Sequence, residues 1–293
     1  MPLLQDYNKL FEQTSNIRRA IVNGTVVWPA KLPSTPASEP FYVENISNST
    51  ETLSIQKFNS NSPTLTIEYS TDNSNWNTFG TTDFDTPLTM SLNAGDKVYL
   101  RCTANVWNNN RINGVSKIGG NIMSLLYGSN FTGKETTFPT NNSYAFERLF
   151  QGMNGSNLNL VDASELLLPI DTLTPYCYEG MFCVCENLTV FPELPATTLA
   201  EGCYRFLFAY CSSLTAAPEL NATVLVDYCY EGLFDSCTSL REIKCLATTN
   251  VGYQATGNWT YSVSSTGTFT KAAGVTWLTG VSGIPSGWTV TEV

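Results

Sequence analysis

The sequence predicts a mainly β protein with short helices: an N-terminal helix plus hairpin, a β-sandwich domain, and a C-terminal solenoid of repeats closed by a β cap. Two observations carry this prediction. Apolar and polar residues alternate in the first half of the chain, which is the pattern of half-buried strands. A 26-residue repeat occupies the second half, and such a period is typical of stacked supersecondary units. The predicted divisions are an anchor at 1–30, a linker at 31–40, a sandwich at 41–118, repeats at 119–250 and a cap at 251–293.

The first residues are predicted to form an amphipathic helix of about three turns. Residues 1–30 have two open interpretations. They are either a small element packing on its own domain or an anchor that docks or oligomerises on a larger particle. As an anchor, the segment would use the apolar residues Leu3, Leu4, Tyr7, Leu10, Phe11, Ile17, Val26 and Trp28.

A hairpin and a linker are expected to follow the helix. Asn23-Gly24 lies between IRRAIV and TVVWPA, and this dipeptide between apolar runs is a strong hairpin signal. Residues 31–40, KLPSTPASEP, are rich in proline and serine and lack core-forming side chains. Such a segment is a semi-rigid spacer.

The region from Phe41 is predicted to be a β-sandwich, because several short alternating segments are separated by polar turn clusters. Trp76 and Trp107 lie beside these loops and have two open roles, stacking on a sugar ring or packing in the core. The predicted strands are 52–58, 64–70, 88–92 and 97–102.

The repeat is defined by cysteines 26 residues apart, at Cys177, Cys203 and Cys229 (203 − 177 and 229 − 203). Tyr178 and Phe182 fall at helical spacing, and the following stretch suits a short or irregular strand because proline cannot donate to a ladder. A short helix plus a short strand per unit is the leucine-rich-repeat plan. The predicted repeat core is Cys177, Phe182, Cys185, Leu188, Cys203, Phe208, Cys211, Leu214, Cys229, Phe234, Cys237 and Leu240.

The repeats are expected to have a degenerate first unit and a capped end. Residues 144–153 align with residues 176–185, and an insertion around 155–160 is predicted to form a loop. Residues 251–293 are predicted to form strands that cover the open end of the repeats. The expected packing anchors of this cap are Trp259, Phe269, Trp277 and Trp288.

The cysteines are interpreted as buried thiols, with a disulfide framework or a metal site as the alternatives. Their number, nine, is odd, and the chain has no histidine. Cys183-Val-Cys185 is not a zinc-ligand spacing. No metal ligand and no cofactor are therefore predicted.

Catalysis is not expected. Without histidine, neither a Ser-His-Asp triad nor a Cys-His pair can form. A glycosidase needs only two carboxylates ~5–10 Å apart, and Glu193 and Glu219 on successive repeats are candidates. These glutamates recur because the repeat recurs, so no catalytic residue is predicted.

The net charge of −10 argues against nucleic acid as a partner. No apolar run approaches the ~18–20 residues that span a bilayer, so no membrane insertion is expected. The N-terminal MPLLQDYNKLFEQ contains Asp6, Lys9 and Glu12 and lacks the apolar core of a secretory signal peptide.

The segment CYEGLFDSCTSL at 229–240 resembles the F-x-x-C-x-x-L unit of BspA-like leucine-rich repeats, found in surface proteins of gut bacteria and their phages. The segments at 119–128, 193–199 and 283–290 are also similar to this group, and the resemblance covers roughly Phe41 to Val293. It implies a leucine-rich-repeat solenoid and a surface-binding role.

Together with the lack of an export signal, the resemblance predicts a phage head or tail fibre or decoration protein located in the virion. Its expected partners are other virion proteins of the capsid or tail, further copies of itself in a homo-oligomer, and a host-surface glycan or protein. The alternative is a bacterial cell-surface adhesin whose export signal has been removed.

Overall fold

The computed structural model describes residues 20–22, 25–27, 38–104, 107–139, 142–152 and 159–293, the first two segments by their backbone. Within these ranges the protein is mainly β, with several separate sheets and one short α-helix, α2 (Ser124–Tyr127), followed by a 3₁₀ turn, η1 (Gly128–Asn130). The chain divides into two compact units, Met1–Ser34 and Thr35–Val293. This division lies in the segment predicted to be a linker.

The first unit contains the predicted hairpin. Strand β1 (Ala20–Val22) pairs antiparallel with β2 (Thr25–Val27), so Asn23-Gly24 connects two adjacent strands. Of the proposed anchor residues, Val26 lies on β2. The predicted helix and the residues Leu3, Leu4, Tyr7, Leu10, Phe11, Ile17 and Trp28 lie outside the described part of the chain.

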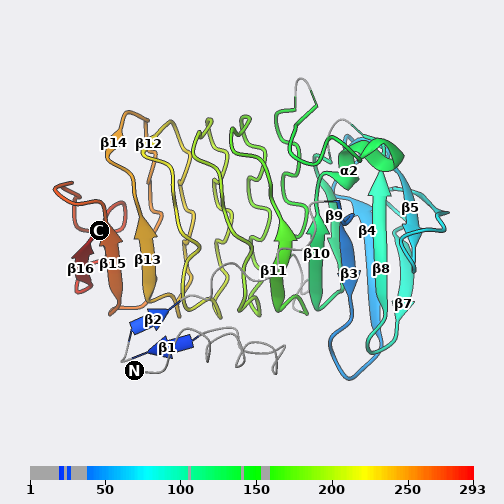
Figure 1. Ribbon diagram of the computed structural model, residues 1–293, viewed down its shortest axis with the longest axis horizontal. Helices are drawn as coiled ribbons and strands as arrows, with labels where there is room; N and C mark the ends of the chain where they lie inside the picture. The colour runs from blue at the N-terminus through cyan, green and yellow to red at the C-terminus, as the bar shows by residue number, and fades with distance from the viewer. Residues whose placement is uncertain (1–19, 23–24, 28–37, 105–106, 140–141, 153–158) are drawn as a thin grey trace, which may run out of the picture. The chain divides into compact units, whose positions relative to one another are not determined.

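The second unit begins with a mixed sheet and an antiparallel sheet. A sheet in the order β11-β10-β3-β8-β5-β6 and a three-stranded sheet in the order β7-β4-β9 share one hydrophobic core (Figure 1). The strands are β3 (Tyr42–Glu44), β4 (Glu51–Lys57), β5 (Thr66–Ser70), β6 (Asn77–Thr81), β7 (Leu88–Leu92), β8 (Lys97–Cys102), β9 (Asn110–Asn113), β10 (Lys117–Asn121) and β11 (Asp162–Leu167).

The four strands predicted from alternation coincide with β4, β5, β7 and β8. Their inward residues are buried as the period of two requires, with Leu53, Ile55 and Ile67 fully inaccessible. Trp107 is also fully buried, and its indole nitrogen donates to the carbonyl of Leu125 at 2.6 Å. The sugar-stacking interpretation is therefore wrong for Trp107, which is a core residue.

Strand β10 connects the sheets to the repeats. It pairs antiparallel with β3 and parallel with β11, and one hydrophobic core continues on both sides of it. The predicted division between residues 118 and 119 falls inside this strand.

The short helices predicted for the repeats are wrong. Residues 176–184 form consecutive turns in which every fourth residue has a positive φ: Tyr176 at 56°, Gly180 at 59° and Val184 at 64°. The N–H of Cys183 donates to the carbonyl of Gly180 at 3.0 Å, whereas the N–H of Phe182 donates to Leu207 in the next copy at 2.9 Å. A right-handed helix accommodates neither the left-handed residues nor the exchange of alternate hydrogen bonds between copies.

The turn runs explain why the sequence resembled a helix. A turn period of four residues places Tyr178 and Phe182 on the same side, as i and i+4 are in a helix, and both are fully buried. Runs with the same left-handed positions recur at 202–210 and 228–236.

The same hydrogen-bond register extends beyond the predicted repeats in both directions. Upstream, the N–H of Phe146 donates to Cys177 at 2.8 Å, so the degenerate first unit pairs as the alignment predicts. Downstream, the N–H of Phe234 donates to Trp259 at 2.9 Å. Residues 257–263 lie in the cap segment that was predicted to form strands, and for these residues the prediction is wrong: Asn258 and Ser262 are left-handed, as in the other turn runs. Most of the predicted 155–160 loop lies outside the described residues.

Short parallel pairings connect the copies elsewhere. Strand β12 (Val224–Leu225) pairs with β14 (Thr249–Asn250), and β13 (Glu242–Cys245) pairs with β15 (Thr268–Lys271), which pairs with β16 (Thr289–Glu292). Isolated bridges such as Thr172↔Thr198 replace strands in other copies. Figure 1 shows β13 beside β15, and β11 further along the repeats pointing the same way.

Aromatic rings form two columns through the copies. In one column Tyr178, Tyr204 and Tyr230 stack at 5.9 and 6.1 Å. In the other column the ring-centroid distances are 5.4–6.1 Å, and its members are Phe150, Phe182, Phe208 and Phe234. Both columns end on Trp259, at 6.2 Å from Tyr230 and 6.5 Å from Phe234. All twelve residues of the predicted repeat core are fully buried.

All nine cysteines are free and buried, which agrees with the interpretation as thiols and contradicts a disulfide framework. The thiol of Cys211 donates to the carbonyl of Phe182 at 3.2 Å, and that of Cys237 donates to Phe208 at 3.0 Å. Burial raises the pKa of Cys177 and of Cys245 to about 12. These side chains therefore serve as small core residues that bond across copies.

Candidate functional site

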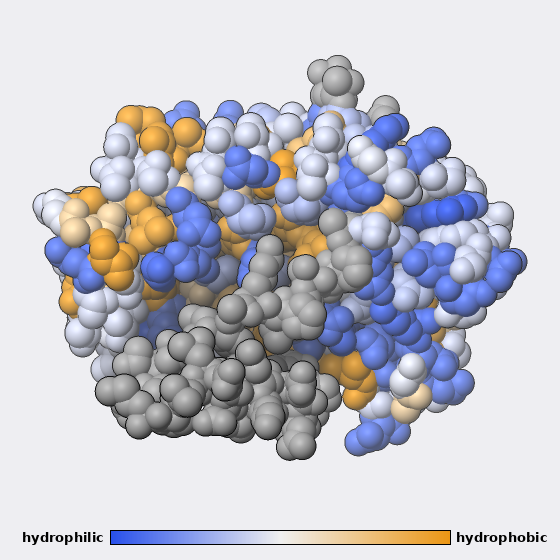
Figure 2. Space-filling model, viewed as in Figure 1, coloured by the Kyte–Doolittle hydropathy of each residue, from blue (hydrophilic) through white to orange (hydrophobic). Residues whose placement is uncertain are grey.

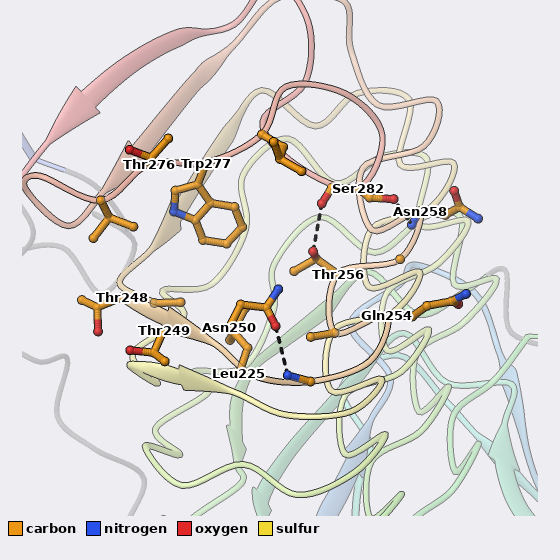
Figure 3. A pocket seen from close by; sticks show the side chains of 16 residues that line it. Leu225, Thr248, Thr249, Asn250, Gln254, Thr256, Asn258, Thr276, Trp277 and Ser282 are labelled. Carbon is orange, nitrogen blue, oxygen red and sulfur yellow. Dashed lines mark hydrogen bonds between the residues drawn. The ribbon is translucent and has the colours of Figure 1, made fainter.

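A pocket of about 460 Å³ lies near the C-terminal end of the second unit (Figure 3). One wall consists of residues 247–258, and the other consists of residues 275–282. Figure 3 shows Thr276 and Trp277 across the pocket from Thr248, Thr249 and Asn250. The volume falls within the ~300–1,000 Å³ typical of small-molecule sites.

The first wall is positioned by β14 and the turn run after it. The pairing of β14 with β12 fixes Thr249 and Asn250. The chain then turns at Gly252, whose N–H donates to Asn250 Oδ1 at 3.2 Å. A Cβ at Gly252 would lie 2.1 Å from the carbonyl carbon of Val226, so only glycine permits this close approach of two backbones.

The second wall is bound to the first by short hydrogen bonds. Thr256 Oγ1 donates to the carbonyl of Ser282 at 2.9 Å, and the N–H of Asn258 donates to Ser282 Oγ at 3.0 Å. The N–H of Ile284 donates to the carbonyl of Leu278 at 2.8 Å, which closes the loop on itself. The two walls of the pocket are thus held together by the turn run at 253–262.

Trp277 was expected to be a packing anchor, and its ring does stack on Trp259 at 5.4 Å and 11°. Its indole nitrogen differs from those of the other buried tryptophans, because it is buried without a hydrogen-bond partner among the described residues. By contrast, Trp259 Nε1 donates to Gly283 at 2.8 Å and Trp288 Nε1 donates to Ser264 at 2.7 Å. A buried donor without an acceptor is costly for packing alone.

The side chains that line the pocket are neutral. Hydroxyl groups come from Thr248, Thr249, Thr256, Thr276 and Ser282, and amides come from Asn250, Gln254 and Asn258. None of the lining residues ionises near neutral pH, although the chain as a whole has a charge of −10. This lining offers hydrogen-bond donors, hydrogen-bond acceptors and an aromatic face. It contains no group that would transfer a proton near neutral pH and no nucleophile activated by a neighbouring base.

Exposed apolar residues gather in the same part of the chain. Leu278 at the pocket is 83% exposed, and Val251 and Val293 are 69% and 66% exposed. Figure 2 shows more apolar surface where β15 and β16 lie than over β4, β5 and β8. The surroundings of the pocket therefore offer apolar contact area beside the polar lining.

Several ionisable groups of the repeats lie away from the pocket, in a column of equivalent positions on the turn runs. Arg205 lies between Glu179 and Glu231, with N–O distances of 3.4 and 2.6 Å. Burial raises the pKa of Glu147 and of Glu179, and for Glu179 the neighbouring Glu147 adds to the effect. These charges pair with one another along the column.

The carboxylates considered for glycosidase chemistry do not join the pocket. Glu193 is exposed, and Glu219 forms a salt bridge with Lys244 at 2.8 Å. In the described part of the chain, no group of three or more metal-ligating side chains is placed to hold a metal ion. No helix in these ranges is long and apolar enough to cross a membrane.

Sequence reasoning missed the pocket. The predicted core residues of the repeats are buried in the hydrophobic core, and of the predicted residues only the cap residue Trp277 lines the pocket. The signal available was the segment 247–258, ATTNVGYQATGN, which is rich in threonine and amide residues and contains no charge.

Comparison of the chain with protein-family models, curated protein sequences and solved structures finds no match.

Proposed function

We propose that this protein is a non-enzymatic attachment protein, specifically a fibre or decoration protein of a phage virion. In this proposal the repeats form a leucine-rich-repeat solenoid with a C-terminal β cap, and the pocket binds a ligand on the host surface. Residues 1–30 anchor the protein to the capsid or tail. The resemblance of the repeats to BspA-like surface proteins supports the assignment to this class.

The observation that carries the proposal is the position of the pocket at the end of the aromatic columns. Both columns end on Trp259, and Trp259 supports Trp277 in the pocket wall. Because each copy bonds to the next through its backbone, the columns are a stiff support for the site at their end. A rigid scaffold that presents a pre-formed pocket suits binding.

The chemistry of the pocket also supports binding over catalysis. Acid–base catalysis requires a group that exchanges a proton near the working pH, and the lining residues are hydroxyls, amides and apolar side chains. The buried thiols are poor nucleophiles, because burial raises the pKa of Cys203 and Cys211 well above the ordinary value.

Mass spectrometry of purified virions tests the location. The protein is expected in the particles at a copy number consistent with a symmetric oligomer. Its absence from particles, together with its presence on the bacterial envelope, would replace the virion proposal with the cell-surface adhesin.

Deletion of residues 1–30 tests the anchor. The shortened protein is expected to be missing from particles while the remaining chain keeps its cooperative thermal unfolding. Incorporation of the shortened protein at the wild-type level would assign anchoring to another part of the chain.

A further inference from the structure

We infer that the pocket formed by residues 247–258 and 275–282 binds a neutral saccharide unit. The inference rests on the proposed function, since it names the class of ligand for an attachment protein. It is argued from three properties of the pocket: its neutral polar lining, its aromatic wall, and the unpaired donor on that wall.

The lining matches a ligand rich in uncharged hydroxyl groups. Thr248, Thr249 and Thr276 carry hydroxyls, and Asn250 carries an amide, so each can both donate and accept. Sugar hydroxyls have the same dual character. A phosphate, carboxylate or ammonium group would enter without an opposite charge among the lining side chains, and its desolvation would go uncompensated.

The aromatic wall supplies an apolar surface, which the hydroxyl groups of the lining do not. A sugar ring has apolar C–H patches as well as hydroxyls, and an indole combines a broad apolar face with one N–H donor. Trp277 borders the pocket and is held by its stack on Trp259 at 5.4 Å, with Phe269 edge-on at 5.5 Å. The ring therefore has a fixed support on the side away from the ligand.

The unpaired indole nitrogen distinguishes Trp277 from a packing residue. Trp107, Trp259 and Trp288 each donate to a backbone carbonyl, whereas Trp277 Nε1 is buried without an acceptor among the described residues. Of these four indoles, only that of Trp277 keeps its donor free of a protein acceptor, so it is the one that a ligand hydroxyl could pair with.

A direct test measures the affinity of the full chain for sugars. The probes are a glycan array, followed by titration calorimetry with glucose, galactose, mannose, N-acetylglucosamine and N-acetylgalactosamine, and with glucuronic acid as the charged comparison. Neutral saccharides are expected to bind, and glucuronic acid is expected to bind at least tenfold more weakly. Equal or tighter binding of the acid would overturn the inference.

Two variants locate the binding site. Trp277→Ala removes the aromatic wall and is expected to weaken binding at least tenfold. Thr249→Trp places a large ring in the pocket from an exposed strand position, and it is expected to abolish binding without touching the core. The control is Phe84→Ala, which removes an exposed ring in the sheet region and should leave the affinity unchanged.

The outcomes separate this inference from the proposed function. If no neutral saccharide binds, or if Thr249→Trp binds like the wild type, the ligand assignment is wrong even when virions contain the protein. Binding of an unglycosylated protein that Thr249→Trp blocks would also overturn it. If saccharides bind as predicted but virions lack the protein, the ligand assignment stands and the virion proposal falls.

Discussion

The sheet region and the repeat region bury similar side chains but connect them differently. In the sheets, Leu53 and Ile55 alternate with outward residues along β4, which pairs with two neighbouring strands. In the repeats, each copy contributes one ring to each column and bonds to the copies before and after it. Stability in the repeats is therefore approximately a sum of contacts between neighbouring copies. A destabilising substitution in one copy should weaken the adjacent copies first.

The largest expected effect comes from breaking a column. Phe208 stacks between Phe182 and Phe234 at 5.4 and 6.1 Å, so Phe208→Ala removes two contacts and opens a cavity. The expected loss in the free energy of unfolding is about 3–5 kcal/mol. Hydrogen exchange should accelerate in residues 176–185 and 228–237 while β4 and β8 remain protected.

Ile55→Ala in β4 is the matched change in the sheet region. The acceleration of hydrogen exchange that it causes should be confined to β4, β7 and β9. Equal acceleration throughout the chain for both variants would contradict a difference in how the two regions are connected.

Two glycines separate backbone strain from packing between copies. Gly95 and Gly202 both have positive φ, at 86° and 57°. A Cβ at Gly95 meets nothing within 4 Å, whereas one at Gly202 would lie 2.3 Å from the ring of Tyr176 in the preceding copy. We expect Gly95→Ala to cost about 1–2 kcal/mol and Gly202→Ala about 2–4 kcal/mol in chemical denaturation. Equal costs would show that the ring of Tyr176 moves freely.

Two tyrosines compare hydrogen bonding in the two regions. The hydroxyl of Tyr42 in the sheet donates to Glu165, whereas the buried hydroxyl of Tyr204 in the column has no partner among the described residues. Tyr42→Phe should cost about 1–2 kcal/mol, while Tyr204→Phe should leave the free energy of unfolding unchanged or raise it. A marked loss for Tyr204→Phe would reveal a partner for this hydroxyl.

The smallest effect concerns pH. Burial, aided by Glu147, raises the pKa of Glu179 above its ordinary value, so the folded state holds this proton more tightly than the unfolded state does. Acidification from neutral pH toward the ordinary glutamate pKa of about 4.3 therefore adds stability through this group. Carboxylates with lowered pKa, such as Glu165 in the sheet region, act in the opposite direction.

Glu179→Gln removes the contribution of this single carboxyl group. Between pH 7 and pH 5 the free energy of unfolding of this variant should decrease relative to that of the wild type, because the wild type gains stability through Glu179 and the variant does not. Urea denaturation at both values measures the difference, with the exposed Glu193→Gln as the control. If the variant gained more stability on acidification than the wild type, the contribution of Glu179 would have the opposite sign.

The strands and the hairpin could be predicted from the sequence, whereas the backbone of the repeats could not, because a helix and a run of four-residue turns give the same spacing of buried residues. Alternation located β4 and β8, and Asn23-Gly24 located the hairpin, because a period of two has one common structural cause. The spacing of Tyr178 and Phe182 fits both a helix and a run of four-residue turns. Only the left-handed backbone at residues such as Tyr176 and Val184, which are poor candidates for a positive φ, distinguishes them.

The pocket could not be predicted, because its two walls come from separate segments and the local sequence does not show that they lie across from each other. Trp277 was expected to pack, and it does stack on Trp259. Its place in a pocket wall depends on residues 247–258 lying across from it, and β14 in that segment is fixed by its register with β12. Neutral threonine and amide residues carry no motif that would mark a site in the sequence.

Hydrogen–deuterium exchange of the full chain, with and without N-acetylglucosamine and galactose at saturating concentration, shows where a saccharide binds. We expect slower exchange in residues 247–258 and 275–282 with at least one of these sugars, and no change in β4, β5 and β8. Protection in the sheet region or on the turn runs instead, or no protection with either sugar, would contradict a saccharide site at the end of the aromatic columns.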